Sequence, residues 1–183
     1  FGVAALVVLL VACRKTPVTV ASVSVFGATM ILLYTVSTLY HALNVNRAKR
    51  VFRVLDHCTI YLLIAGTYTP LTIALLNRSD ATILLSVVWA GASAGILLSL
   101  FWPTAPRWLS TLVYVALGWV AVWYLPQLWA GGGPIVVWLI VAGGVLYTLG
   151  AVVYGTKKPD PSPTWFGFHE IFHAFTVAAW ACH

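Results

Sequence analysis

The sequence predicts an all-α, polytopic membrane protein: a bundle of seven transmembrane helices that forms a single domain over residues 1–183. Composition is the first observation, because 61% of the residues are hydrophobic, 8% are charged and the mean hydropathy is +0.95. Such a chain lacks the polar surface of a soluble domain. The second observation is that apolar runs of about 20 residues recur between charged or Pro/Gly-rich breaks, and each can cross a bilayer core of about 30 Å as a helix.

The spans follow one another along the chain with short breaks between them. Phe1 to Cys13 is apolar, and we interpret it as the end of a first helix rather than a signal peptide, because it shows neither a basic leader nor a small-residue cleavage site. Six further spans are expected at approximately residues 18–43, 52–76, 82–102, 107–126, 135–155 and 165–183. Their apolar runs are continuous rather than alternating, which favours helices over the strands of a β-barrel.

The distribution of basic residues predicts the orientation. The loops after the second, fourth and sixth spans share seven basic residues, namely Arg47, Lys49, Arg50, Arg53, Arg107, Lys157 and Lys158. The other side has only Arg14, Lys15 and Arg78. The positive-inside rule therefore places the N-terminus and the richer loops in the cytoplasm. Basic loops at the headgroup level also explain the net charge of +6 without a nucleic-acid partner.

Four polar residues are expected near the cytoplasmic face. Alternation of the spans brings the end of the second span and the starts of the third and seventh to that side, and these positions hold His41, Asp56, His169 and His173. Polar groups in the hydrocarbon layer are costly, so a cluster at one depth is more typical of a functional site than of bundle packing. His169 and His173 are four residues apart on one helical face, as are Ser37 and His41.

This set of residues predicts a zinc site. Three neutral imidazoles, from His41, His169 and His173, leave the fourth position of a tetrahedral zinc ion open to a water, whose pKa falls toward about 7. Asp56 is then placed to orient that water or to accept its proton. The alternative is that His169 and His173 are interfacial histidines packed in the bundle.

The remaining histidines and the cysteines do not fit the same site. His57 lies about 100° around its helix from Asp56 and is expected to face elsewhere. His183 is expected at the opposite membrane face. The three cysteines, Cys13, Cys58 and Cys182, are far apart in sequence, which argues against a disulfide framework and a thiolate zinc site.

Glu170 lies between the two histidines of the seventh span and completes the string HExxH, in which the glutamate is the general base of a metalloprotease. A metalloprotease of that class also needs a third ligand downstream on a soluble scaffold. Only ten residues follow His173, and Glu170 is expected at the membrane edge. The sequence therefore favours an interfacial, partly solvated Glu170 over a protease base.

Three motifs occur in order along the chain. They are Ser37-Thr38-Leu39-Tyr40-His41, Leu55-Asp56-His57 with the following Tyr61 to Pro70, and Phe168-His169-Glu170-Ile171-Phe172-His173. At these residues the chain resembles the hemolysin III family, the bacterial branch of the progestin and adipoQ receptor superfamily. The resemblance implies a seven-helix bundle in the bacterial inner membrane, and zinc held near the cytoplasmic face by His41, His169 and His173. It also implies that Asp56 contacts the zinc through water, with Ser37 beside it.

Three functions are compatible with these features. The family is grouped with alkaline ceramidases, so the resemblance favours a zinc-dependent hydrolase that acts on a lipid amide or ester, with Asp56 as proton acceptor and Ser37 holding the oxyanion or the water. A second hypothesis is a receptor or regulator of membrane lipid state in which Zn²⁺ is structural. A cytolysin or pore is the third, and no span shows the polar stripe that a water-filled pore needs. In the first two hypotheses the partner is a membrane lipid.

Overall fold

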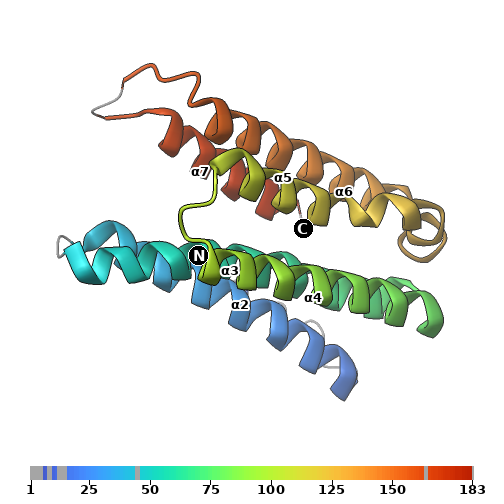
Figure 1. The fold of residues 1–183 in the computed structure, drawn as a ribbon. Coiled ribbons are helices and arrows are strands. Elements are labelled where there is room, and N and C mark those ends of the chain that lie inside the picture. The colour runs from blue at the N-terminus through green and yellow to red at the C-terminus, as the bar shows by residue number, and fades with distance from the viewer. Residues whose placement is uncertain (1–5, 8–9, 12–15, 44–45, 163–164, 183) are drawn as a thin grey trace. The chain divides into compact units, whose positions relative to one another are not determined.

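The chain folds into helices (Figure 1). The computed structural model describes residues 6–7, 10–11, 16–43, 46–162 and 165–182. Within these ranges there is no β-strand, and an isolated bridge pairs Ser162 with Phe166. The helices form two compact units, Phe1–Ala105 and Pro106–His183. The all-α prediction is confirmed for the described residues.

The first unit contains three long helices, α2 (Pro17–Ala42), α3 (Asn46–Leu75) and α4 (Arg78–Phe101). Side chains cap two of them: Thr16 Oγ1 accepts the N–H of Thr19 at 3.2 Å, and Asn77 Oδ1 accepts the N–H of Asp80 at 2.9 Å. Such caps satisfy N–H groups that have no partner inside the helix. In this unit α3 is the central helix, because it packs against both α2 and α4.

Two glycines allow the helices of this unit to approach closely. A Cβ atom at Gly66 on α3 would overlap Thr29 Oγ1 on α2, and a Cβ atom at Gly95 on α4 would overlap the ring of Tyr61 on α3. Tyr61 is fully buried. These contacts fix how far α2 and α4 are shifted along α3, since a slip by one residue would replace each glycine with a bulkier neighbour.

Helix α3 begins before the third predicted span. The span was expected at about residues 52–76, and α3 is already helical at Asn46 and runs for 30 residues, about 45 Å. Arginine, lysine and alanine are good helix formers, so the charged segment continues the helix beyond the hydrocarbon layer instead of interrupting it. Twenty residues counted back from Leu75 reach Asp56, which places that carboxylate at the edge of a bilayer core about 30 Å thick.

The second unit contains α5 (Arg107–Gly118), the 3₁₀ helix η1 (Trp119–Tyr124), α6 (Leu125–Thr156) and α7 (Phe168–Ala181). Gly133 interrupts α6 with φ 75° and ψ 179°, a conformation open essentially to glycine alone. The chain reverses there (Figure 1), inside the break that we predicted at Ala130–Pro134. As a result α6 packs against α5 on its way back, and then against α7.

Among the residues that the structure describes, four helical segments are long and apolar enough to cross a membrane: Pro17–Ala42, Arg47–Leu75, Arg78–Phe101 and Arg107–Thr156, the last of which includes the break at Gly133. The chain is therefore a multi-pass membrane protein. The predicted first span falls largely outside the described residues, although Leu6, Val7, Leu10 and Val11 are helical. Seven crossings and a cytoplasmic N-terminus stay predictions, and Cys13 and His183 lie outside the described part of the chain.

Candidate metal centre

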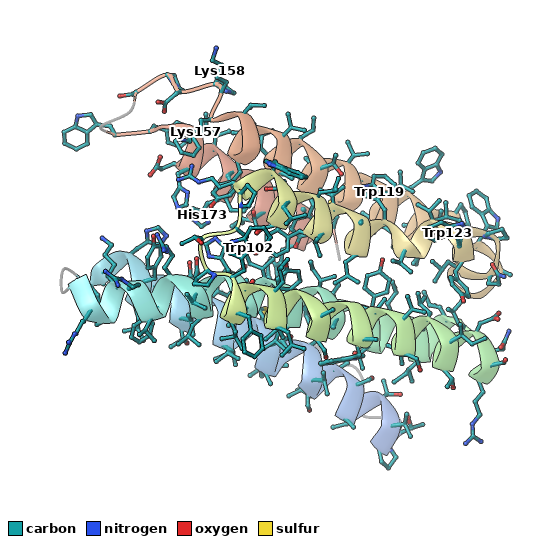
Figure 2. All side chains as sticks on the ribbon, in the orientation of Figure 1. Trp102, Trp119, Trp123, Lys157, Lys158 and His173 are labelled. Atoms are coloured by element: carbon teal, nitrogen blue, oxygen red, sulfur yellow. The ribbon has the colours of Figure 1, made fainter. Side chains whose placement is uncertain are left out.

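His169 and His173 form a close pair on α7. Their Nε2 atoms are 3.1 Å apart, and the rings meet edge to face with centroids separated by 4.6 Å. Both side chains are half-buried. In this unit Figure 2 shows His173 at the same end as Lys157 and Lys158, whereas Trp123 lies at the other end. The predicted i, i+4 pairing is confirmed as a side-chain contact.

The spacing of these two nitrogens fits one zinc ion. With Zn–N bonds of about 2.0–2.1 Å and a tetrahedral angle, two imidazole ligands stand about 3.3 Å apart. The observed 3.1 Å between the Nε2 atoms is close to that value. The same distance is within hydrogen-bond range, so the two imidazoles can hydrogen-bond directly or share one ion.

Two carboxylates hold the first turn of α7, on which His169 lies. Glu170 Oε2 accepts the N–H of Gly167 at 2.8 Å, and Asp160 Oδ1 accepts the N–H of Phe168 at 3.0 Å. Because Gly167 is the N-cap and has no side chain, only the glutamate half of a capping box operates here. Glu170 therefore serves as a helix cap at an exposed position. This role agrees with the expected solvated glutamate at the membrane edge and not with the general base of a metalloprotease.

Sequence reasoning missed two residues beside the histidine pair. Asp160 carried no motif, because its bond to α7 depends on the shape of the loop between α6 and α7. The ring of Tyr154, on the last turns of α6, lies 6.2 Å from that of His169 and 5.0 Å from that of Phe172.

The packing of α6 against α7 keeps these rings together. A Cβ atom at Gly150 would lie 3.0 Å from Cβ of Phe175, so the two helices touch closely one turn from Tyr154. An open apolar groove of about 340 Å³ lies at the other end of α6, near Gly133. Its lining residues are Leu125, Pro126, Trp129, Val137, Trp138 and Val141. It carries no polar lining and is separate from the histidine pair.

The other predicted site residues lie in the first unit. Ser37 and His41 are on the last turns of α2, with His41 exposed and its ring packed edge-on against Tyr40 at 4.9 Å. Asp56 is half-buried on the third turn of α3. The structure thus describes Ser37, His41 and Asp56 in one unit and the histidine pair in the other.

Helix register places the three residues of the first unit at one height. Thr29 on α2 is level with Gly66 on α3, and the two helices run in opposite directions because only residues 43–45 join them. Leu39 lies ten residues after Thr29 on α2, and Asp56 lies ten residues before Gly66 on α3. Asp56 is therefore level with the middle of the Ser37–His41 turn, within about 3 Å of either residue along the helix axis.

His57, Cys58 and Cys182, which we excluded from the site, lie next to other groups or are free thiols. His57 Nδ1 is 2.7 Å from the Arg53 carbonyl oxygen of the same helix, so the protonated nitrogen donates to its own backbone. Cys58 is a buried free thiol, with its Sγ 4.0 Å from the Ile96 carbonyl oxygen. Cys182 is a free thiol at the end of α7.

Comparison with known proteins agrees with the helical architecture. The chain is 35% identical over 158 residues to a hemolysin-3 homolog of Bacillus subtilis (strain 168), which covers 86% of this chain and 71% of the relative. It is 33% identical over 178 residues to hemolysin-3 of Bacillus cereus, and this match covers 96% of this chain and 78% of that protein. An adiponectin receptor protein of Drosophila melanogaster is 30% identical in an alignment 170 residues long, which covers 80% of this chain and 37% of that protein.

No solved structure matches the chain. The sequence does match the family described as haemolysin-III related, and the match runs from residue 1 to residue 183. Since the whole length is matched and two bacterial relatives exceed 30% identity, this chain belongs to the haemolysin-III related family.

Proposed function

We propose that this protein is a zinc-dependent hydrolase of the bacterial inner membrane that cleaves an amide or ester bond of a membrane lipid. The observation that carries the proposal is the His169–His173 pair, whose Nε2 atoms stand 3.1 Å apart, close to the separation that two ligands of one zinc ion require. Such a pair at the end of an apolar helix is costly to maintain without a function.

His41 is the proposed third ligand. It lies on the last turn of α2, and the alternation of spans predicts that this turn and the start of α7 share the cytoplasmic face.

When bound, zinc supplies a Lewis acid that polarises a carbonyl and lowers the pKa of a coordinated water. Asp56, level with the Ser37–His41 turn, accepts the proton as general base. The Ser37 hydroxyl, one helical turn before His41, donates a hydrogen bond to the developing oxyanion or holds the water. The half-burial of Asp56 and Ser37 leaves both groups accessible to a substrate.

Metal content and turnover together test this proposal. Purified wild-type protein should contain about one zinc ion per chain, and His41→Ala, His169→Ala and His173→Ala should each lose it and unfold at lower temperature, because bound metal stabilises the folded state. Asp56→Asn should keep zinc but lose about 100-fold or more of any lipid amide or ester hydrolysis. His57→Ala is the matched control and should keep both, since its ring bonds to its own helix.

Elemental analysis that finds full zinc in all three histidine variants would remove these residues as ligands. Complete zinc loss in Asp56→Asn would make Asp56 a direct ligand instead of a base.

A second candidate is a receptor or regulator of membrane lipid state in which zinc only ties helices together. The observation in its favour is the 30% identity to a protein named as an adiponectin receptor. Full zinc content with no hydrolysis of any lipid amide or ester, and an unchanged phenotype in Asp56→Asn, would favour this candidate over the enzyme.

A further inference from the structure

The charged residues of the second unit are all at one end. Arg107, Lys157, Lys158, Asp160 and Glu170 are its five charged side chains, and residues 108–156 contain none. Arg107 opens α5, the two lysines follow α6, and the two acids adjoin the start of α7. Since α5 and α6 pack side by side around the reversal at Gly133, this charged end is also the end that carries the histidine pair.

Both acids at this end already have partners. The carboxylate of Asp160 accepts the Phe168 N–H at 3.0 Å, and that of Glu170 accepts the Gly167 N–H at 2.8 Å. Their negative charge faces the start of α7, where the helix dipole also attracts it. The three cations therefore outnumber the two acids at this end, and both carboxylates are already bonded to backbone N–H groups.

Arg107 differs from the two lysines because an aromatic ring holds it. Its guanidinium carbon lies 5.8 Å from the centroid of the Tyr154 ring, a cation–π arrangement. Tyr154 in turn lies 6.2 Å from the His169 ring, so no more than about 12 Å separates the guanidinium from that ring. The Arg107 side chain is nevertheless exposed and can receive a ligand.

Exposed aromatic side chains mark this end as the headgroup layer. Trp108 is 65% exposed, Trp165 is 88% exposed and Phe166 is 51% exposed. Tryptophan is enriched where the bilayer meets water, because one part of its ring is apolar and another donates a hydrogen bond. At this depth the phosphate groups of lipids are the anions nearest to Arg107.

We infer that Arg107, held by Tyr154, binds the phosphodiester of an anionic phospholipid, such as phosphatidylglycerol, beside the histidine pair. The planar guanidinium suits two parallel hydrogen bonds to phosphate oxygens, which an ammonium group cannot form. The inference rests on the proposed lipid-directed function, to which it adds the charge class of the lipid. A lipid anchored at Arg107 extends toward His169 within the length of one phospholipid molecule.

Lipid-dependent thermal unfolding of the full chain in a neutral detergent tests the inference. Phosphatidylglycerol should raise the melting temperature in a saturable manner and at lower concentration than phosphatidylcholine, whose phosphodiester is compensated by its own ammonium group, whereas inorganic phosphate should have no effect. Arg107→Gln should weaken the apparent affinity for phosphatidylglycerol by about ten-fold or more, as expected for a hydrogen-bonded ion pair. Arg107→Lys keeps the charge and should recover only part of that affinity. Tyr154→Phe keeps the ring and should bind like wild type.

Lys158→Gln is the matched control, because it removes one positive charge from the same end without touching Tyr154. It should weaken binding by less than about three-fold. Equal losses in Lys158→Gln and Arg107→Gln would show diffuse attraction and overturn the inference, as would equal stabilisation by phosphatidylcholine and phosphatidylglycerol, or stabilisation by inorganic phosphate alone. Zinc content is measured on the same samples. If the histidine variants lose zinc but the wild-type protein shows no preference for phosphatidylglycerol, only this inference is refuted. If the protein binds phosphatidylglycerol selectively but contains no zinc, only the zinc proposal is refuted.

Discussion

At the scale of single residues, the start of α7 depends on two carboxylates. Asp160 and Glu170 satisfy two of the N–H groups that a helix leaves without partners in its first turn. His169 is the second residue of that turn, whereas His173 lies one turn further in. Loss of the caps therefore disturbs the position of His169 more than that of His173.

Substitutions at Glu170 separate a cap from a catalytic base. Glu170→Gln keeps an oxygen that can accept the Gly167 N–H, so the protein should keep its zinc, its melting temperature and any hydrolytic activity. Glu170→Ala loses the acceptor and should lower the melting temperature by a few degrees. Circular dichroism melts, zinc analysis and a hydrolysis assay check these outcomes. Abolished turnover in a folded, zinc-loaded Glu170→Gln would restore the metalloprotease interpretation.

At the scale of elements, the packing of α3 against α4 depends on the absence of a side chain at Gly95. The ring of Tyr61 fills the space that a Cβ atom would need, and this ring is fully buried. The same arrangement recurs between α2 and α3, where Thr29 Oγ1 occupies the space beside Gly66. Small residues at helix contacts are a common means of close packing in membranes.

Gly95→Ala should therefore destabilise the protein although alanine is the better helix former. Overpacking of a filled contact costs about 1–3 kcal/mol, which exceeds the roughly 0.5–1 kcal/mol gained from helix propensity. Gly118→Ala is the control, since nothing lies within 4 Å of a Cβ atom there. Thermal unfolding in detergent should show a lower melting temperature for the first variant and an equal or higher one for the second. Equal melting temperatures for both variants would contradict the close approach of Tyr61.

The elements differ in how well the sequence predicted them. The break near Gly133 was predictable because three glycines and a proline interrupt an apolar run, and both glycine and proline disfavour helix. The helical start of α3 was not predicted, because the charged segment was considered only as the boundary of a membrane span, although arginine, lysine and alanine favour helix. For the candidate site, the four-residue spacing was sufficient to pair His169 with His173. The Asp160 cap depends on the conformation of the loop before α7, and the level of Asp56 relative to the Ser37–His41 turn depends on the Thr29–Gly66 contact. Neither feature is contained in a local sequence pattern.

At the scale of the whole molecule, the proposed zinc site requires that α2 end and α7 begin on the same side of the membrane. Single cysteines at Lys49, Thr104 and Lys158, in a background without Cys13, Cys58 and Cys182, test this requirement. In intact cells a membrane-impermeant thiol reagent should leave all three unmodified, and should modify cysteines at Ser79 and Gly131. The five chosen positions are exposed, so the side of the membrane decides the labelling. If cysteines at positions Lys49 and Lys158 were labelled from opposite sides of the membrane, a zinc site that uses both His41 and the histidines of α7 would be excluded.

The break at Gly133 also has a consequence for how the protein is made. Between Arg107 and Lys157 the nascent chain offers the insertion machinery no charged residue, so nothing in its charge marks where one crossing ends and the next begins. As one uninterrupted helix this 50-residue segment would be about 75 Å long, more than twice the thickness of a bilayer core. A backbone conformation that glycine alone adopts readily allows both arms to enter together as a hairpin, and the positive-inside rule predicts that the basic residues at its two ends stay on the cytoplasmic side.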